Sequence, residues 1–159
     1  MNDSSFVDFY AAAKDQCLRA VLVAGLPSGE AEDALAEAFA RAWASWGSLQ
    51  RHPAPKAWVV RTALNAQISW WRRRRREFPH ATPPEATTEP QATPWRLPPV
   101  IANLPARQRE VLALRLLLGL STAETATCLG IAPGTVTAHL HRALSTLRAH
   151  PSIREEILS

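Results

Sequence analysis

The stretch STAETATCLGIAPGTVTAHLHRALSTLR, residues 121–148, decides the fold of the C-terminal part of the chain. It opens on Ser121 and Glu124, whose spacing is that of a capping box and predicts the start of a short helix. The turn IAPG follows at 131–134. Behind it, one apolar face recurs at helical spacing: Val136, Leu140, Ala143, Leu144 and Leu147. A short helix, a glycine-containing turn and a second helix together indicate a helix-turn-helix unit.

The second helix of such a unit lies in the major groove of DNA. With its apolar face turned inward, the outward positions are Thr135, Thr137, Ala138, His139, His141, Arg142 and Ser145. Arg142 is the predicted phosphate or guanine contact, and Thr135 and Thr137 suit phosphates near the start of the helix. His139 and His141 either donate hydrogen bonds or are simply solvated. Because the helix has few cations, we expect it to bind DNA weakly alone and to need a second DNA-binding surface.

A proline-rich segment separates this unit from the rest of the chain. Prolines stand at positions 79, 83, 84, 90, 94, 98 and 99. Because proline lacks a backbone donor and blocks helix continuation, residues 78–98 are predicted to form an extended linker. The chain then divides into modules at 1–77 and 99–159, and neither shows strand alternation. The sequence therefore predicts an all-α fold of two small helical domains joined by a Pro-rich linker.

The first module is predicted to contain three long helices. Apolar residues recur at steps of three and four over residues 6–24, and Pro27-Ser28-Gly29 ends that pattern. Ser28 is a suitable N-cap for the second helix, which carries its apolar stripe as far as Trp46. A loop is predicted from Gly47, and the third helix then runs from Pro55 to about Arg76.

The third helix carries a polar stripe beside its apolar one. Its members are Trp58, Thr62, Asn65, Ser69, Arg72 and Arg76. Aromatic rings stack on bases while arginine holds phosphates, so this stripe predicts a surface for a nucleic-acid strand. The run Arg72–Arg76 has a plainer interpretation as a solvated helix end, favoured by the negative pole of the helix dipole. Five consecutive residues sweep more than one turn and cannot all face one strand.

The charges of the chain are polarised although the net charge is only +4. Acidic residues gather at 30–37, whereas Arg72–Arg76 form an unbroken basic run. Such patches suggest one basic partner and one polyanionic partner, and nucleic acid is the obvious polyanion. A solvated acidic face that complements the dipole at the start of a helix is the alternative for the acidic patch.

Three stretches are similar to a known family. AEDALAEAFARAW (31–43) and AWVVRTALNAQISWWRRRRRE (57–77) resemble region 2 of the extracytoplasmic-function group of bacterial sigma-70 RNA polymerase sigma factors. The second of these is most similar to the actinobacterial SigE-like subset. LPARQREVLALRLLLGLSTAETATCLGIAPGTVTAHLHRALSTLR (104–148) resembles region 4 of the same family. Their order around a short linker is more specific than either motif alone.

The resemblance implies functions for both modules. Region 2 of the family docks on core RNA polymerase and opens the promoter −10 element, and region 4 binds the −35 element. Carried over by position, the polymerase-binding residues are Asp33, Glu37, Phe39 and Arg41. The −10 residues are Trp58, Arg61, Asn65, Ser69, Arg72, Arg73 and Arg76, with the loop Gly47–Lys56 as the site that captures an unstacked base. The −35 residues are Thr135, Thr137, His139, His141 and Arg142.

The sequence departs from the family pattern at several of these positions. Ala36 stands where the family often has Gln, which weakens the match at the docking helix. Thr137-Ala138 replace a frequent Lys-Ser pair, and the loop RHPAPK at 51–56 is individual. The resemblance therefore does not give the −35 sequence.

No catalytic, metal or cofactor site is predicted. The chain lacks a Gly-rich phosphate loop, an HExxH helix and a nucleophile elbow, so neither an enzyme activity nor a small-molecule substrate is expected. His139 and His141 are two apart on a helix and point in opposed directions, so they cannot chelate together. Cys17 and Cys128 fall in apolar patterns as inert thiols. No apolar run is long enough to span a membrane, and two widely separated cysteines predict a reduced, cytoplasmic compartment. The resemblance implies that the protein acts there at the nucleoid.

A stand-alone helix-turn-helix regulator is the alternative function. Such a protein binds duplex DNA by itself, whereas a sigma factor needs core polymerase, so a gel shift separates the two. The tryptophan- and arginine-rich third helix favours the sigma factor, since a regulator would not require it. A dedicated anti-sigma partner and the relative placement of the two modules are left open by the sequence.

Overall fold

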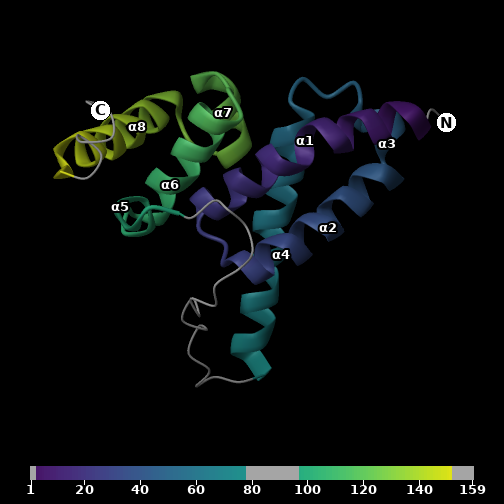
Figure 1. The fold of residues 1–159 in the computed structure, drawn as a ribbon, viewed down its shortest axis with the longest axis horizontal. Helices are drawn as coiled ribbons and strands as arrows, with labels where there is room; N and C mark the ends of the chain where they lie inside the picture. Colours follow the sequence, from purple (N-terminus) through teal and green to yellow (C-terminus); the bar gives the residue numbers. More distant parts are fainter. Residues whose placement is uncertain (1–2, 78–96, 152–159) are drawn as a thin grey trace.

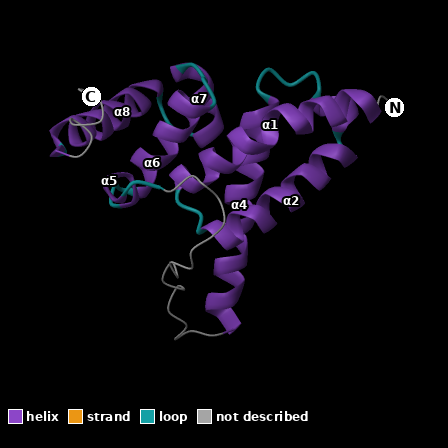
Figure 2. Ribbon diagram, in the orientation of Figure 1, coloured by secondary structure: helices purple, strands orange, loops and turns teal. Residues whose placement is uncertain are grey.

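The computed structural model describes residues 3–77 and 97–151, and for residues 67–77 it describes the backbone alone. Figure 2 shows that the regular structure in these ranges is helical, which confirms the predicted all-α class. The elements are α1 (Asp3–Ala24), α2 (Ser28–Ala44), α3 (Trp46–Leu49), α4 (Pro55–Glu77), α5 (Pro99–Ala102), α6 (Ala106–Leu112), the π-helical turn η1 (Ala113–Leu117), α7 (Thr122–Leu129) and α8 (Pro133–Ala149). The predicted linker at 78–98 lies outside the described residues except for its last two positions.

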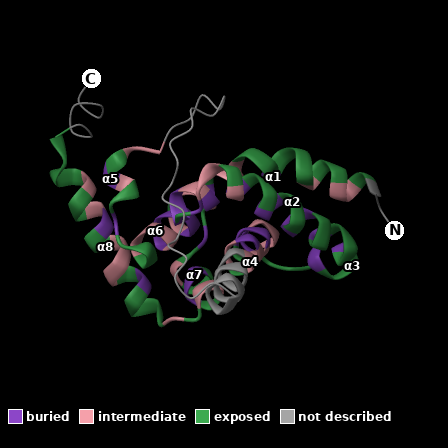
Figure 3. Ribbon diagram, turned by 90° about the horizontal axis from the view of Figure 1, so that it is seen from below, coloured by how far each residue is buried: buried purple, intermediate pink, exposed green. Residues whose placement is uncertain are grey.

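Small residues let α1, α2 and α4 approach closely in the first module. On α1, Ala13, Cys17 and Ala20 are fully buried, as their spacing predicts. On the face of α4 that meets them, Val59, Val60 and Ala63 are fully buried. Figure 3 shows the buried residues gathered where the three helices meet, while the outer side of α1 is exposed.

Aromatic rings close the other end of this module, near the start of α1. Phe6 lies edge-on to Trp46 with ring centroids 5.5 Å apart, and Phe9 stacks on the same indole at 5.0 Å. Trp46 is only 5% exposed, and its indole N–H donates to Ser5 Oγ over 3.3 Å. Burial of Trp46 and Leu49 turns residues 46–49 into the one-turn helix α3, so the loop predicted from Gly47 begins later than expected.

The start of α2 also differs from its prediction. Ser28 is the first helical residue, and Pro27 takes the N-cap position without a side-chain hydrogen bond. The turn before it is set by Gly25, whose φ of +124° lies in a region that favours glycine. Its backbone N–H and that of Leu26 both donate to the carbonyl of Val21, which ends α1.

The second module is built from α5 to α8. Leu114, in η1, is 1% exposed, and Val111, Val136 and Ala143 are fully buried between α6 and α8. Gly119 follows η1 with a φ of +69°, as expected of a helix-ending glycine.

The two modules pack against each other. In Figure 1, α6 lies beside the C-terminal part of α1, and the contacts between α1 and both α6 and η1 confirm this placement. One apolar cluster therefore includes Val21 of α1, Val59 of α4 and Leu114 of η1. The sequence predicted two cores but not that they merge.

In the described part of the chain, no helix is long and apolar enough to cross a membrane. Within the same ranges, no three His, Cys, Asp or Glu side chains lie close enough together to hold a metal ion.

Candidate nucleic-acid interface

The outer face of α2 carries the residues predicted to bind polymerase. Asp33, Glu37 and Arg41 are exposed at successive i,i+4 positions, and Arg41 donates to Glu37 over 2.8 Å. These two side chains are 58% and 57% exposed, so their pair stabilises the fold little and both charges stay available to a partner. The prediction that Phe39 binds polymerase is wrong. Its side chain is only 5% exposed and its ring lies edge-on to Tyr10, so it packs in the core and presents no surface to polymerase.

The predicted −10 surface follows α4. Arg61 and Asn65 are exposed one turn apart, whereas Trp58 is half-buried and packs against the apolar core. The indole therefore offers at most part of its surface to a base. Figure 1 shows that the C-terminal part of α4 projects beyond the rest of the molecule. Four predicted contacts fall in this part, where the structure does not describe side chains: Ser69, Arg72, Arg73 and Arg76.

Local and long-range contacts hold the loop that leads into α4. The backbone N–H of Ala54 donates to Nδ1 of His52 over 2.9 Å. Lys56 Nζ donates to Oε1 of Gln16 in α1 over 2.8 Å, and the carbonyl of Lys56 lies 4.0 Å from the thiol of Cys17. Burial raises the pKa of this thiol to about 12, against the opposing charge of Lys56. The entry to α4 is thus fixed to α1, next to the loop that the resemblance assigns to base capture.

The predicted helix-turn-helix is formed by α7 and α8. Ser121 Oγ accepts from the backbone N–H of Glu124, and the Glu124 carboxylate accepts from the N–H of Ser121, each over 3.0 Å. Hydrogen bonding from Ser121 to the carboxylate, first of all from its backbone N–H, holds the pKa of the Glu124 carboxyl below its ordinary value. Gly130 ends α7 with a φ of +68°, and α8 begins three residues later at Pro133.

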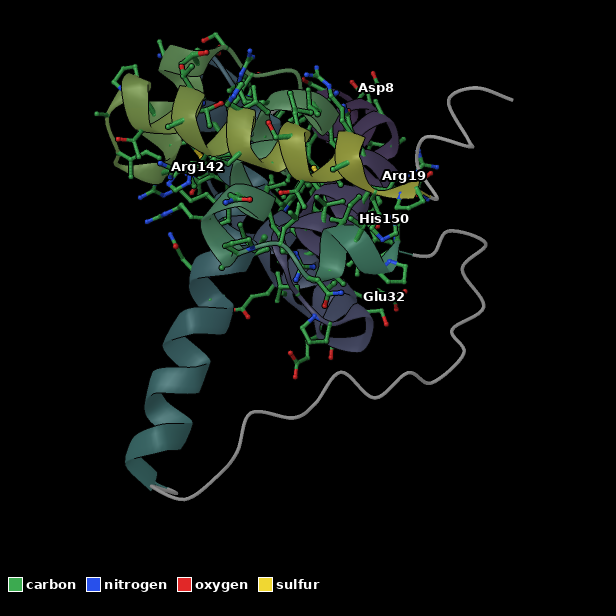
Figure 4. All side chains as sticks on the ribbon, turned by 90° about the vertical axis from the view of Figure 1, so that its left-hand side faces the viewer. Asp8, Arg19, Glu32, Arg142 and His150 are labelled. Atoms are coloured by element: carbon green, nitrogen blue, oxygen red, sulfur yellow. The ribbon has the colours of Figure 1, made fainter. Side chains whose placement is uncertain are left out.

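The outer face of α8 exposes four of the five predicted −35 residues: Thr135, Thr137, His141 and Arg142. Ser145, expected to face outward, is exposed as well. Figure 4 shows Arg142 on the outer side of α8, at the surface of the molecule. His139 was predicted to face outward, but it is half-buried, and its Nδ1 is buried without a hydrogen-bond partner among the described residues. It lies three residues after buried Val136 and four before buried Ala143, which places it at the edge of the inward stripe.

The two candidate DNA-binding surfaces come from modules that touch. Helix α7 packs against α4, beside the predicted −10 surface. Burial raises the pKa of Cys128 in α7, and the nearby charge of Arg61 in α4 opposes that rise. The −10 surface on α4 therefore lies next to the first helix of the helix-turn-helix, α7.

Two polar residues that join the modules had escaped the sequence analysis. Arg109 of α6 donates to the carbonyls of Leu22 and Val23 in α1. Gln16 of α1 donates to the carbonyl of Leu117 in η1. Arg109 lies within the stretch that resembles region 4, but polar side chains on amphipathic helices are ordinarily solvated, so no local signal marks either residue as a contact between modules.

Comparison with known proteins supports both modules. The family described as Sigma-70 region 2 matches residues 16–77, and the family described as Sigma-70, region 4 matches residues 97–147. The RNA polymerase sigma-E factor of Streptomyces coelicolor is 34% identical over 148 residues, covering 90% of this chain and 84% of that protein. The chain belongs to the sigma-70 family. It is a sigma factor of the extracytoplasmic-function group, as the residues had indicated, and it directs core RNA polymerase to promoters and starts DNA-templated transcription.

Other relatives and solved structures agree with this assignment. The sigma-E factor of Streptomyces avermitilis is 32% identical over 155 residues, covering 94% of this sigma factor and 87% of its relative. Among solved structures, the sigma factor RpoE in complex with the anti-sigma factor NepR from Bartonella quintana superposes with a TM-score of 0.74, at 24% identity, and the match covers 92% of this chain and 94% of that one. CnrH in complex with the cytosolic domain of CnrY gives a TM-score of 0.59 at 23% identity, covering 93% and 88%. At these identities the structures show a shared fold.

Proposed function

We propose that this sigma factor binds core polymerase through the outer face of α2, opens the −10 element with α4 and its preceding loop, and binds the −35 element with α8. The domain limits 1–77 and 99–159 belong to this proposal. The main observation behind this proposal is that each module exposes polar side chains on one helix, and that other contacts hold the start of that helix in place. Arg61 and Asn65 lie on α4, and Arg142 lies on α8.

The −35 contact rests on the first three turns of α8. Thr135 and Thr137 stand near its N-terminus, where backbone N–H groups and the helix dipole favour phosphate. The Thr137 hydroxyl donates its proton to the carbonyl of Pro133 over 3.2 Å, so its lone pairs can accept from an amino group of a base edge, while the backbone N–H groups at the helix start are the donors for phosphate. Arg142 lies two turns further along and has the fork geometry that suits guanine or phosphate. His141 lies beside it and is exposed as well.

The −10 element is opened by capturing an unstacked base. Flipping a base costs a few kcal/mol, which pocket contacts must offset. The loop between α3 and α4 is suited to this task because two contacts hold it in place. His52 accepts a hydrogen bond from the backbone N–H of Ala54, and Lys56 at the end of the loop donates to Gln16 of α1. Beyond the loop, Arg61 and Asn65 are exposed toward a displaced strand, and the arginine run continues along the projecting end of α4.

We assign polymerase docking to one exposed stripe of α2, formed by Asp33, Glu37 and Arg41. Asp33→Arg should weaken capture of core polymerase in a pull-down by at least tenfold. Glu32→Arg is the matched control, since it makes the same charge change at an exposed neighbouring position on a different side of the helix. Equal loss in both variants would show that general charge, and not this stripe, governs docking.

In this proposal the chain catalyses no reaction of its own, as a member of a family of transcription regulators. It acts in the cytoplasm, at the nucleoid. It takes no small-molecule substrate or cofactor. A dedicated anti-sigma partner stays a prediction for this chain, since the complexes named above concern other sigma factors.

Run-off transcription with purified core polymerase tests the proposal. We expect promoter-dependent transcripts from genomic fragments only when this chain is added to core, and only weak gel shifts when the chain meets the same DNA alone. Tight operator binding without polymerase, together with no transcript from any fragment, would favour the stand-alone regulator and overturn the proposal.

A further inference from the structure

One histidine is fixed by a backbone hydrogen bond in the loop that leads into α4. The backbone N–H of Ala54 donates to Nδ1 of His52 over 2.9 Å. A backbone amide always carries its proton, so Nδ1 must present a lone pair, and the neutral imidazole then carries its own proton on Nε2. A single hydrogen bond therefore sets both the direction of the ring and its tautomer. Because His52 is exposed, its Nε2–H is a donor at the surface of the loop.

This contact takes the place of a capping interaction that α4 lacks. The carbonyl of Ala54 accepts from the N–H of Trp58 over 3.2 Å, so Ala54 is the residue that precedes the first turn. In a capping box, a Glu or Gln three positions further on binds the backbone N–H of that residue, but Ala57 stands there. His52 accepts from this N–H instead, from the chain before the helix. The imidazole therefore has a fixed place relative to the start of α4.

The backbone around the histidine has little freedom. Positions 53 and 55 are prolines, whose φ is fixed, and the residue before each proline is confined to extended conformations. At the end of the loop, Lys56 donates to Gln16 of α1 over 2.8 Å. Figure 2 shows the loop between α3 and α4 as an arch at the edge of the molecule. Such a loop can meet DNA with a low cost in ordering.

Among residues 52–56, His52 carries the side chain that is placed to bind a base. The prolines and the alanine between them have no polar side-chain atoms. Lys56 is half-buried and directs its ammonium group to Gln16. Arg51 precedes this stretch, and its long side chain must lose rotamer freedom on binding, which the fixed imidazole does not.

We propose that His52 determines which base the −10 loop accepts, by donating from Nε2 to a hydrogen-bond acceptor on the edge of the captured base while Ala54 holds the ring in place. This inference rests on the proposed capture of an unstacked base by the same loop. A fixed donor selects strongly, because a base that presents an amino group at that point leaves two donors facing each other without a partner.

The first experiment examines the ring in the free chain. In a long-range proton–nitrogen NMR correlation spectrum at pH 8, the His52 ring should carry its proton on Nε2. The Ala54 amide should exchange with water about fivefold more slowly in the parent than in His52→Ala or His52→Gln, since neither variant forms the bond. His52→Asn should keep the slow exchange, because an Asn side chain accepts from the N–H two residues further on. A proton on Nδ1, or equal exchange in the parent and His52→Ala, would overturn the inference.

The second experiment measures the coupling between the histidine and the base with holoenzyme. Forked duplexes are made from a promoter found by run-off transcription, with the −10 non-template strand already single-stranded and one abasic nucleotide at each position in turn. Affinity is measured by fluorescence anisotropy. His52→Ala should bind the intact fork about fivefold more weakly than the parent. At one abasic position the parent should lose the same affinity, and His52→Ala should lose nothing more, because both changes remove one contact.

Three variants sharpen this comparison. His52→Asn should restore most of the affinity for the intact fork, since it keeps both the bond to Ala54 and an outward donor. His52→Gln carries the same amide on a longer side chain that cannot form this turn, and it should not restore the affinity. Thr127→Ala is the matched control: Thr127 is exposed, and its hydroxyl donates to the carbonyl of Ala123 over 3.1 Å within α7, so its loss should leave binding unchanged.

The outcomes separate this inference from the proposed function. If His52→Ala loses equally at every abasic position, the histidine only supports the loop, and if His52→Gln restores binding as fully as His52→Asn, the bond to Ala54 is not needed. Either result would overturn the inference and leave base capture intact. If no abasic position weakens binding by the parent, base capture itself fails, and the assignment of His52 falls with it even where the NMR results are as expected.

Discussion

Replacing Leu114 with alanine tests whether the two modules share one core. Leu114 is 1% exposed and lies in η1, yet it belongs to the same apolar cluster as Val21 and Val59 of the first module. Truncating a fully buried leucine costs about 2–5 kcal/mol. Leu116 is the matched control: it lies two residues away in the same turn but is 57% exposed, so its truncation should change the free energy of unfolding by no more than about 0.5 kcal/mol.

The tryptophans make the assay selective, since five of the six lie in the first module, the sixth, Trp95, lies in the predicted linker and can be replaced by phenylalanine, and none lies in the second module. Fluorescence therefore follows the first module, while far-ultraviolet circular dichroism follows helices of both. A loss of about 3 kcal/mol moves the urea midpoint by about 1.5 M if the slope is about 2 kcal/mol per M. Leu114→Ala should shift both signals together. If circular dichroism shifts while the fluorescence midpoint stays, or if Leu116→Ala costs as much, the shared core is refuted.

Three further predictions follow from individual contacts. Ser121→Ala removes the capping box and should lower the free energy of unfolding by about 1 kcal/mol at neutral pH, measured in urea. Because the folded-state pKa of Glu124 is lowered, the contribution of its carboxylate is present at neutral pH and lost as the pH falls through that lowered value, so the difference in stability between the parent and a Glu124→Ala variant should shrink in acid. Burial raises the pKa of Cys17 to about 12, so in a variant without the other cysteine no thiol should react with Ellman's reagent at pH 8 until urea unfolds the chain. Arg142→Ala should weaken holoenzyme binding to −35 duplex at least tenfold in fluorescence anisotropy, whereas Arg148→Ala, in the last turn of α8, should leave it unchanged.

Local signals in the sequence predict most of the secondary structure. The capping box at Ser121, the proline at position 55 and the apolar steps along α1 each act within one or two turns, so their outcome does not depend on the rest of the fold. Helix α3 was missed because it forms only when Trp46 meets Phe6 and Phe9, which lie about forty residues earlier in the chain.

The candidate site was predictable where exposure follows helical periodicity, as for Arg61, Asn65 and Arg142. It was not predictable at Phe39 and His139, because a residue at the edge of a helix stripe is exposed or buried according to what packs beside it. The contacts of Arg109 are even harder to predict from the sequence, because their partners lie 86 and 87 positions away along the chain. Backbone carbonyls accept these bonds. Because every residue has such a carbonyl, the amino-acid sequence does not show which one will accept a hydrogen bond.

The shared core holds the two modules together in a closed state, and we expect core polymerase to supply the energy that separates them into an open state. Separating the modules exposes Ala113, Leu114 and their partners to water and breaks the bonds of Arg109, so the free chain favours the closed state. If closed molecules outnumber open ones about a hundredfold, any partner that binds only the open state loses about a hundredfold in apparent affinity, or about 2.7 kcal/mol. Thermodynamic linkage makes the relation reciprocal: if polymerase binds only the open state, it strengthens the binding of any promoter DNA that also needs that state by the same factor. We expect each DNA-binding surface to bind weakly alone, so that neither surface opens the molecule on DNA before core polymerase has done so.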